Sequence, residues 1–593
     1  MSVKQKFVFP LIASIVIIGV MYYALIPPFN LQSVDFWMFL IYCTIVVIVC
    51  FAFPVVKHAG TTFFDDILLG GWRSLFSRKK KDENSEEGSA KDHKAILVGL
   101  GIIAFLVIGL FVGNVASSPF FNARSYSQLI DVQDGDFATD ISEISVKTVP
   151  VVDRDTAIRL GSRTIGEMDD LVSQFAIDEG AHSYTQINYK NTAYRVSPLI
   201  YADIIKWITN TGKGLPGYVT VNMVTQDTQL VRLPEGQYMH ISTGEHFNNY
   251  LYRYVRFRFP TKIFGVAAFE IDDDGAPYWI VPTVSMRIGL FGGEDYDGAI
   301  LVNACTGETQ YFALDEIPTW CDKVFDADLV YGQLDYYGRY RGGFWNSIIG
   351  QSGVLVPTGT DAPSLFSKDR SSGGYTADNA GVYNYLAIDD DVYMYTGMTS
   401  ANSDESLVGF VLVNLRTKAT SYYVCAGATE SSAMSSAEGQ VQQMNYNATS
   451  PLLLNIADRP TYFLSLKDAA GLVKMYAFID VEQYQIVGTG STIDQAQENY
   501  ITALASSNEV DVDENALAQT EDLPTATGKV VSAQPVVVDG NTVYYFMLED
   551  DSNVYTATID VNERLPFLGA GDTVSLTYTE KDSVRNVSTL TLS

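Results

Sequence analysis

The sequence predicts three transmembrane helices, then a large α+β region of repeated helix and antiparallel-sheet units, and finally a small β-barrel or sandwich. Three observations lead to this fold class. Three long segments before residue 115 are apolar and free of charge, a five-residue pattern recurs three times, and apolar and polar residues alternate after residue 526. The 593 residues are enough for about three to five folding units.

The apolar segments are Phe7 to Ile26, Phe36 to Val56 and Ala95 to Asn114. A helix needs about 20 residues to cross the hydrocarbon core, so each segment is long enough to span a membrane. Lys4 and Lys6 precede the first segment, as in a signal peptide. No small-residue cleavage site follows it, however, so we expect a retained helix.

The two connections between these spans differ in basic residues, and this difference predicts the orientation. The first connection has no Lys or Arg, whereas residues 57–94 are basic and are therefore expected in the cytoplasm. The amino terminus is then inside, and everything after Asn114 is a large extracytoplasmic region of a multi-pass cell-membrane protein. The basic residues of the second connection are Lys57, Arg73, Arg78, Lys79, Lys80, Lys81, Lys91 and Lys94.

The net charge excludes several classes of function. The chain has 39 basic and 69 acidic residues, and the part after residue 114 has 29 basic and 61 acidic residues, a net charge of −32. Such a surface has little attraction for a phosphate backbone, so we expect no nucleic-acid partner. Five Cys and five His also exclude a disulfide-dense scaffold and a repeated zinc module.

The recurring pattern predicts three similar β-hairpins. Gly217–Thr228, Gly298–Thr309 and Gly409–Thr420 share Gly, Val, Asn, Thr and Thr at identical offsets. The apolar run is typical of a strand, Asn and Thr favour a turn, and β-branched or aromatic residues then resume the pairing. A further hairpin from Gly471 to Val487 is a degenerate fourth copy.

Helices are expected between these hairpins. Apolar residues recur at near-helical spacing from Thr156 to Phe175, and Ile200 to Ile208 is a shorter candidate. Thr492 and Gln495 fit a capping box, which predicts a helix from Ile493 to Leu504.

Composition shifts divide the chain into nine parts. The predicted boundaries are two transmembrane helices at 1–56, a cytoplasmic basic loop at 57–94, a third span at 95–114, a first α+β unit at 115–240, a second unit at 241–325, an aromatic and Gly-rich connection at 326–380, a third α+β unit at 381–505, an acidic linker at 506–525, and a small β domain at 526–593.

The second unit carries a resemblance to a known module. Phe269 to Phe312 combines an acid-rich turn, with Asp274 and Gly275 before Tyr278, and a Val-Asn-x-x-Thr-Gly-Glu hairpin. This pattern is similar to the PepSY module of secreted and membrane bacterial proteins. The resemblance implies extracytoplasmic binding or inhibition, and it carries no catalytic residues.

Two further resemblances concern the end of the chain and its overall plan. Gly571-Asp572-Thr573-Val574 enters a late strand of the small β domain, which looks like an OB-type barrel, a small sandwich being the alternative. The whole chain resembles uncharacterised three-span envelope proteins of Gram-positive bacteria. That resemblance supplies a location and no activity.

Clustered polar side chains give the candidate metal sites. Asp272, Asp273 and Asp274 are candidate calcium ligands, but they lack the twelve-residue calcium-loop pattern, and solvated turns are the alternative. His240 and His246 flank Glu245 as zinc ligands would, although their spacing fits no short motif and hydrogen-bonded His is the alternative. We expect no cofactor other than this calcium. A Cys305 to Cys321 disulfide and free thiols are both compatible with the sequence.

A candidate partner-binding surface lies in the segment Tyr331 to Trp345. Aromatic and Arg side chains are enriched at recognition hot spots, and such a patch on an acidic ectodomain favours a protein edge or a glycan. Helical packing between β units is the alternative. The candidate residues are Tyr336, Tyr337, Arg339, Tyr340, Arg341 and Trp345.

Together these features predict a membrane-anchored extracytoplasmic binding or scaffold protein of the bacterial cell envelope, without enzymatic activity. The expected partners are the membrane itself, an envelope protein or cell-wall glycan, and a second copy of the chain. One alternative is a regulator or inhibitor of a secreted envelope enzyme. The other is an enzyme acting on envelope polymers, which requires two carboxylates facing each other across a cleft.

Overall fold

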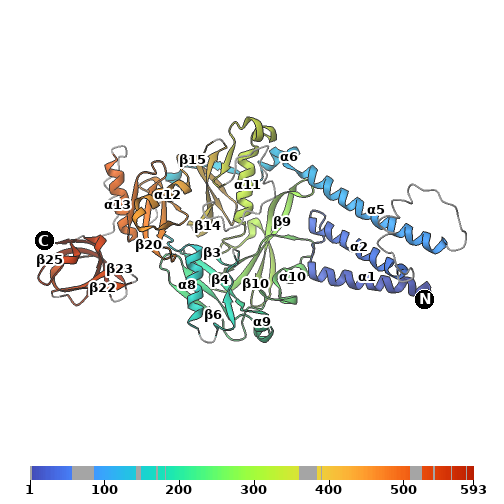
Figure 1. Cartoon of the computed structure of the whole chain (residues 1–593), viewed down its shortest axis with the longest axis horizontal. Helices are drawn as coiled ribbons and strands as arrows, with labels where there is room; N and C mark the ends of the chain where they lie inside the picture. Colours follow the sequence, from blue (N-terminus) through green and yellow to red (C-terminus); the bar gives the residue numbers. More distant parts are fainter. Residues whose placement is uncertain are drawn as a thin grey trace.

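The computed structural model shows three long helices at one end and a β-rich soluble region at the other (Figure 1). Most of the predicted cytoplasmic loop, part of the connection at 326–380 and most of the acidic linker lie outside the described residues. The structure describes residues 3–56, 86–141, 149–168, 171–180, 182–359, 383–388, 390–401, 403–507, 524–538, 541–549, 551–562, 564–581 and 584–592.

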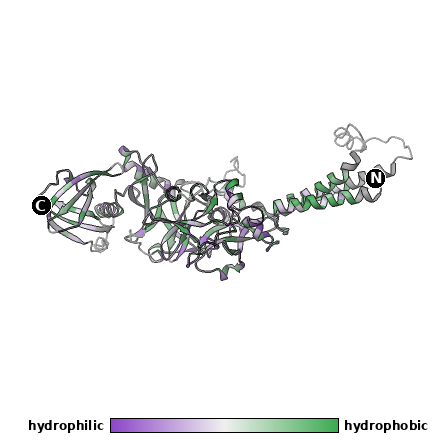
Figure 2. Cartoon of the chain, turned by 90° about the horizontal axis from the view of Figure 1, so that it is seen from below, coloured by the Kyte–Doolittle hydropathy of each residue, from purple (hydrophilic) through white to green (hydrophobic). Residues whose placement is uncertain are grey.

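The three long helices match the predicted spans. They are α1 (Val3–Leu25), α2 (Val34–Val56) and α5 (Glu86–Ser117). Each contains a stretch of 18 to 21 residues that is long and apolar enough to cross a membrane. In Figure 2 the ribbons of these helices are coloured mostly as hydrophobic, whereas the soluble region mixes hydrophobic and hydrophilic residues. The prediction of three membrane-crossing helices is therefore confirmed by length and composition.

The soluble region rests directly on the ends of these helices. In α10 (Leu251–Arg256), Arg253 and Arg256 donate from Nε to the carbonyls of Tyr23 and Ile26, at 2.9 and 3.0 Å. Cations are favourable at the negative end of a helix. At the end of α5, the Ser117 hydroxyl accepts the amide hydrogens of Leu290 and Phe291. These bonds fix the soluble region relative to α1 and α5.

Four antiparallel four-stranded meanders, called units 1 to 4, form the middle of the described chain. Short additional strands extend their sheets: β1 (Val132–Asp134), β2 (Phe175–Ile177), β7 (Ile263–Phe264), β12 (Leu355–Pro357) and β17 (Asn447–Ala448). Unit 1 is β3 (Thr185–Asn188), β4 (Ala193–Tyr201), β5 (Gly217–Asn222) and β6 (Thr228–Arg232); unit 2 is β8 (Ala268–Ile271), β9 (Pro277–Ile288), β10 (Gly292–Asn303) and β11 (Thr309–Ala313); unit 3 is β13 (Asn384–Ile388), β14 (Asp391–Ser400), β15 (Ser403–Asn414) and β16 (Thr420–Ala428); unit 4 is β18 (Leu452–Ile456), β19 (Arg459–Lys467), β20 (Val473–Asp480) and β21 (Val487–Gly490).

The three predicted hairpins are confirmed as the last two strands of units 1, 2 and 3. In each turn the Asn side-chain oxygen accepts two backbone amide hydrogens, at 2.9 to 3.0 Å. These are Asn222, Asn303 and Asn414. The degenerate fourth copy forms the last hairpin of unit 4, where Asp480 accepts the amide hydrogen of Gln483 at 2.7 Å. The shared residues therefore encode one turn.

The helices match the predictions in part. Helix α13 (Ile493–Ser506) begins at the Thr492 cap, whose hydroxyl accepts the Gln495 amide hydrogen. The helix predicted from Thr156 to Phe175 is wrong in its second half, because α8 (Arg154–Gly166) ends early and Phe175 enters β2. The shorter candidate, Ile200 to Ile208, is confirmed in its second half by α9 (Ile204–Asn210), whereas Ile200 lies in β4, paired with β2. The remaining α-helices are α6 (Pro119–Tyr126), α7 (Phe137–Asp140), α11 (Ala327–Tyr340) and α12 (Glu430–Gln440).

The carboxy-terminal strands pair in a closed order separate from the four units. The order is β22-β23-β24-β26-β25, with β24 and β26 parallel. Phe546, Tyr555 and Leu576 are buried among them. The strands are β22 (Thr525–Val538), β23 (Asn541–Leu548), β24 (Val554–Thr558), β25 (Thr573–Lys581) and β26 (Val584–Leu592).

Shared hydrophobic cores hold the units against one another. One core joins Val196 of unit 1, Trp279 of unit 2 and Phe463 of unit 4. A second core joins units 2 and 3 around α11, and a third joins units 3 and 4 around α12. Strand β3 of unit 1 also contacts β13 and β14 of unit 3, and β13 contacts β18 of unit 4, so units 1, 3 and 4 meet.

Candidate functional site

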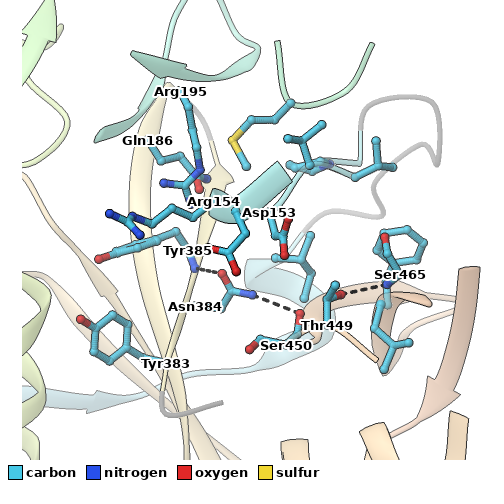
Figure 3. Close-up of a pocket in the computed structure, with 18 of the residues that line it drawn as sticks. Asp153, Arg154, Gln186, Arg195, Tyr383, Asn384, Tyr385, Thr449, Ser450 and Ser465 are labelled. Carbon is cyan, nitrogen blue, oxygen red and sulfur yellow. Dashed lines mark hydrogen bonds between the residues drawn. The ribbon is translucent and has the colours of Figure 1, made fainter. Parts of the chain in front are cut away.

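A cavity of about 430 Å³ lies where units 1, 3 and 4 meet, and we call it the junction cavity (Figure 3). Its volume is within the range of small-molecule sites. Charged, amide, hydroxyl and aromatic side chains line it together. They include Asp153, Arg154, Asp155, Tyr184, Gln186, Arg195, Lys323, Tyr383, Asn384, Tyr385, Thr449, Ser450, Phe463 and Ser465.

Arg154, Gln186 and Arg195 form one wall of the cavity, which we call the donor wall. Arg195 lies in β4 and pairs in register with Gln186 in β3, so both side chains project from the same sheet face. They are 7% and 4% exposed. Arg154 opens α8, and Figure 3 shows its side chain close to the other two.

The donor wall contains three buried nitrogen atoms without a hydrogen-bond partner. They are Nε of Arg154, Nε2 of Gln186 and Nε of Arg195. Within the part of the chain that the structure describes, Arg195 donates only to the Tyr184 carbonyl, at 3.4 Å, and Arg154 donates to the Glu179 carbonyl. Among the described residues, neither arginine forms an ion pair with a carboxylate. Burial lowers the pKa of the Arg195 guanidinium, so the wall holds a charge at a cost in desolvation.

Lys323 approaches the cavity from the segment before α11. Glu270 of β8 holds this segment by accepting the amide hydrogens of Asp322 and Lys323, at 2.9 and 2.8 Å. The Lys323 ammonium lies 5.3 Å from the ring centre of Tyr385. Burial raises the pKa of Glu270 to about 8 and, together with Glu270, raises that of Asp322. Burial therefore disfavours the ionised form of both carboxyls.

Asp153 is an acidic residue of the cavity lining whose counter-charge, Lys467, lies outside the lining. Asp153 accepts hydrogen bonds from Lys467 at 2.5 Å and from the Thr156 amide at 3.0 Å. Burial opposes its ionisation, but these bonds outweigh that effect and lower the pKa of Asp153. Asp155 is exposed. The excess charge within the cavity is thus positive, although the extramembrane region as a whole is acidic.

A second polar group borders the junction cavity. His182, Asp326 and Asp328 place possible ligand atoms within 4.8 Å of one another, as a metal site would. His182 Nδ1 lies 3.6 Å from Asp326, and Tyr383 donates to Asp328 at 2.8 Å. Burial raises the pKa of Asp328 to about 6. His182 is isolated in sequence, and only the fold brings the two acids to it.

The sequence-predicted calcium residues form an ordinary turn. Asp272 accepts the amide hydrogens of Asp274 and Ala276, at 3.1 and 2.8 Å. Asp273 and Asp274 are exposed, and Asp274 also lines a second cavity of about 790 Å³ between units 1 and 2. Their side chains are not among the ligand groups that the described residues bring together.

The zinc and disulfide candidates also have other roles. Glu245 is buried and accepts hydrogen bonds from Tyr201, Trp207 and Thr211, which accounts for its place in the fold without a metal. The ring of His246 packs edge-on against Trp207. Cys305 and Cys321 are free thiols.

The predicted partner surface is divided by the fold. On α11, Arg339 pairs with Asp335 at 2.5 Å, and Tyr336 packs against Tyr126 of α6, with ring centres 4.9 Å apart. Tyr337 lies under Arg341, and Tyr340 packs between Tyr336 and Phe344. Trp345 is 61% exposed, and Arg341 is also exposed. Packing therefore occupies most of the aromatic segment, while its end faces solvent.

Comparison of the sequence with protein-family models and with curated proteins finds no match. The chemistry of the chain is therefore argued from its own residues. Sequence patterns did not single out Arg154, Gln186, Arg195 or Lys323. The available signal was Arg195 itself, a basic residue within the apolar strand Ala193–Tyr201 of an acidic region.

Proposed function

We propose that this chain is a membrane-anchored extracytoplasmic binding protein of the bacterial cell envelope, and that its role is not enzymatic. The observation that carries the proposal is the junction cavity, which three units build together and line with buried charged and polar groups. Such groups are costly inside a fold unless they are paired. A bound molecule supplies the missing partners.

The proposed orientation places the cavity outside the cell. The basic residues at 57–94 support a cytoplasmic loop, and the hydrogen bonds from α10 to α1 tie the soluble region to the opposite end of the spans. A membrane-impermeant maleimide tests this orientation at a Glu235→Cys variant in intact cells. Labelling of Glu235→Cys, with no labelling of Ser85→Cys, is expected.

We further propose that units 1 to 4 are PepSY-like and that the carboxy-terminal strands are OB-like. Repetition of one turn in the four meanders supports the first relation. The closed strand order, with a parallel pair between the third and fifth strands, supports the second. Neither relation assigns a ligand, because a fold alone does not determine function.

The test of the binding function fills the cavity. Full-length protein is purified gently from membranes, and the small molecules it releases on denaturation are identified by mass spectrometry. A Ser450→Trp variant, which places an indole in the cavity, is expected to lose at least about tenfold of the released ligand. Thr502→Trp, on the exposed side of α13, is the matched control. Equal release from both variants would contradict the proposal.

One observation favours the regulator alternative. Arg341 and Trp345 are exposed at the end of the aromatic segment, next to α6 and the end of α5. A protein partner bound there would lie close to the membrane. Crosslinking in intact cells tests this alternative, and a discrete envelope protein lost in an Arg341→Ala, Trp345→Ala variant would favour it. A captured second copy of the chain would indicate a homo-oligomer. Captured cell-wall glycan would favour binding or processing of a polymer.

A further inference from the structure

The donor wall of the junction cavity defines the chemistry of the molecule that fits it. Arginine and the amide nitrogen of glutamine donate hydrogen bonds, and the three unpartnered atoms of this wall are all nitrogens. A molecule that pairs with the guanidinium and amide groups of this wall must carry acceptor oxygens. A carboxylate or a phosphate has this property, and arginine forms short, strong hydrogen bonds with both.

The charges around the cavity agree with an anionic ligand. Arg154, Arg195 and Lys323 line it, and Asp153 already has Lys467 as its counter-charge. Of the carboxyls near the cavity, the buried Glu270 and Asp322 bind the backbone of neighbouring segments, and Asp326 lies 3.6 Å from His182. No carboxylate among the described residues is within ion-pair distance of Arg195.

The other lining residues suit a ring with hydroxyl groups. The Tyr385 ring lies beside Arg154 in Figure 3, and Ser450 and Ser465 add hydroxyl groups to the lining. Asn384 is held in place by its bonds to the Ser450 and Pro451 carbonyls, so this part of the lining is preformed. The combination of aromatic faces and hydroxyls is typical of a carbohydrate ring, and about 430 Å³ accommodates a small one.

We propose that the junction cavity binds a small anionic sugar, whose carboxylate or phosphate group lies against Arg154, Gln186 and Arg195. This inference rests on the proposed function and names its ligand class. Arg195 is the main anion contact, because it is 7% exposed, carries an unpartnered Nε and forms no ion pair with a carboxylate among the described residues. Lys323 adds a third positive charge to the lining.

The experiment measures binding of defined probes to the full-length protein in detergent micelles by isothermal titration calorimetry. The probes are glucose 1-phosphate, glucuronate, inorganic phosphate and uncharged glucose. We expect at least one anionic sugar to bind tenfold or more tightly than glucose. The two sugars distinguish a phosphate from a carboxylate, and inorganic phosphate shows whether the anion suffices without the ring.

The variant Arg195→Met identifies the residue responsible. It keeps the length of the side chain and removes the charge, so we expect at least a tenfold loss of affinity for the anionic sugar. The matched control Arg163→Met changes an exposed arginine on α8 and is expected to leave the affinity within twofold. Equal affinity in wild type and Arg195→Met would overturn the inference.

The melting temperature of the ligand-free protein separates a binding role from a structural one. Replacing an uncompensated buried charge by an apolar side chain is neutral or stabilising, so Arg195→Met is expected to melt at the same or a higher temperature. A clear decrease would show that Arg195 serves the fold and would overturn the inference.

The same measurements keep this inference distinct from the proposed function. Tight binding of glucose, abolished by Ser450→Trp and unaffected by Arg195→Met, would overturn the anionic ligand and leave the binding function standing. Failure of every probe to bind would overturn the inference. If Ser450→Trp also releases as much native ligand as Thr502→Trp, the proposed binding function is contradicted as well.

Discussion

Units 1 and 4 each have an arginine on the second strand of their meander. Among the described residues, only one of these two arginines has a carboxylate partner. Arg459 at the start of β19 donates to Asp480 at 2.7 and 3.1 Å and to Glu482 at 2.9 Å. Arg195 in β4 has no such partner among the described residues. A buried charge that serves the fold carries its counter-charge with it. The contrast therefore separates an arginine that completes its own unit from one that faces a cavity.

The largest expected effect comes from breaking the pair in unit 4. Asp480 is 0% exposed, and Asp480→Ala leaves Arg459 half-buried beside only the exposed Glu482. The loss of one partner of a buried pair costs about 3 to 5 kcal/mol of unfolding free energy. Chemical denaturation of the full chain in micelles, followed by fluorescence, measures this loss.

The control for this prediction is Glu482→Ala, which removes the exposed partner and is expected to cost less than about 1 kcal/mol. If the two variants lose similar unfolding free energy, the pair of Arg459 and Asp480 stabilises the fold no more than a surface contact does. The comparison between the two arginines would then lose its basis.

The carboxyls beneath the junction cavity provide a second way to test the contrast. Burial raises the pKa of Glu270 from 4.5 to about 8, so the folded chain binds more protons than the unfolded chain between these values. Its contribution to stability is full below pH 4.5 and is lost as the pH rises through about 8. The expected decrease is up to about 1.4 kcal/mol per pH unit.

Thermal unfolding between pH 5 and 9 measures this dependence. Glu270→Gln cannot ionise, so its melting temperature is expected to vary less with pH than that of the wild type. Glu167→Gln changes an exposed carboxyl that directly follows α8 and is expected to leave the dependence unchanged. A wild-type stability that rises toward pH 8 would show that Glu270 is ionised and supplies a counter-charge to the neighbouring cations.

Local features of the fold were predictable from sequence. The hairpins of units 1 to 3 depend on Asn222, Asn303 and Asn414, whose side chains bond within their own turns. The start of α13 depends on Thr492 in the same local way. The early end of α8 was not predictable, because apolar residues beyond Gly166 pack into the core of unit 1 from turns and a strand rather than from a helix.

The candidate site was not predictable, because its residues come from segments far apart in the chain. Arg154 opens α8, Arg195 lies in β4, and Lys323 lies in a segment that Glu270 of unit 2 holds, so only the folded chain brings them to one cavity. His182 meets Asp326 and Asp328 for the same reason. The sequence instead emphasised Asp272 to Asp274, whose closeness in the chain reflects a turn.

The smallest expected effect concerns the turn that the units share. The same turn position has a positive φ in units 1 and 2, where it is occupied by Gln226 (φ 65°) and Gly307 (φ 72°). Glycine adopts this conformation without steric cost, whereas other residues are strained in it. Gln226→Gly is therefore expected to raise the unfolding free energy by about 0.5 to 1 kcal/mol.

The reciprocal change, Gly307→Ala, is expected to lower the unfolding free energy by about 1 kcal/mol, since a Cβ there also meets the Tyr254 hydroxyl. That hydroxyl donates to the Gly307 carbonyl at 2.6 Å, so Tyr254→Phe combined with Gly307→Ala separates the contact from the backbone strain. Opposite signs for the two single variants would show that one backbone geometry serves both units. Equal signs would show that the shared Asn and Thr specify the turn in different ways, and that unit 2 needs its glycine for the contact with α10.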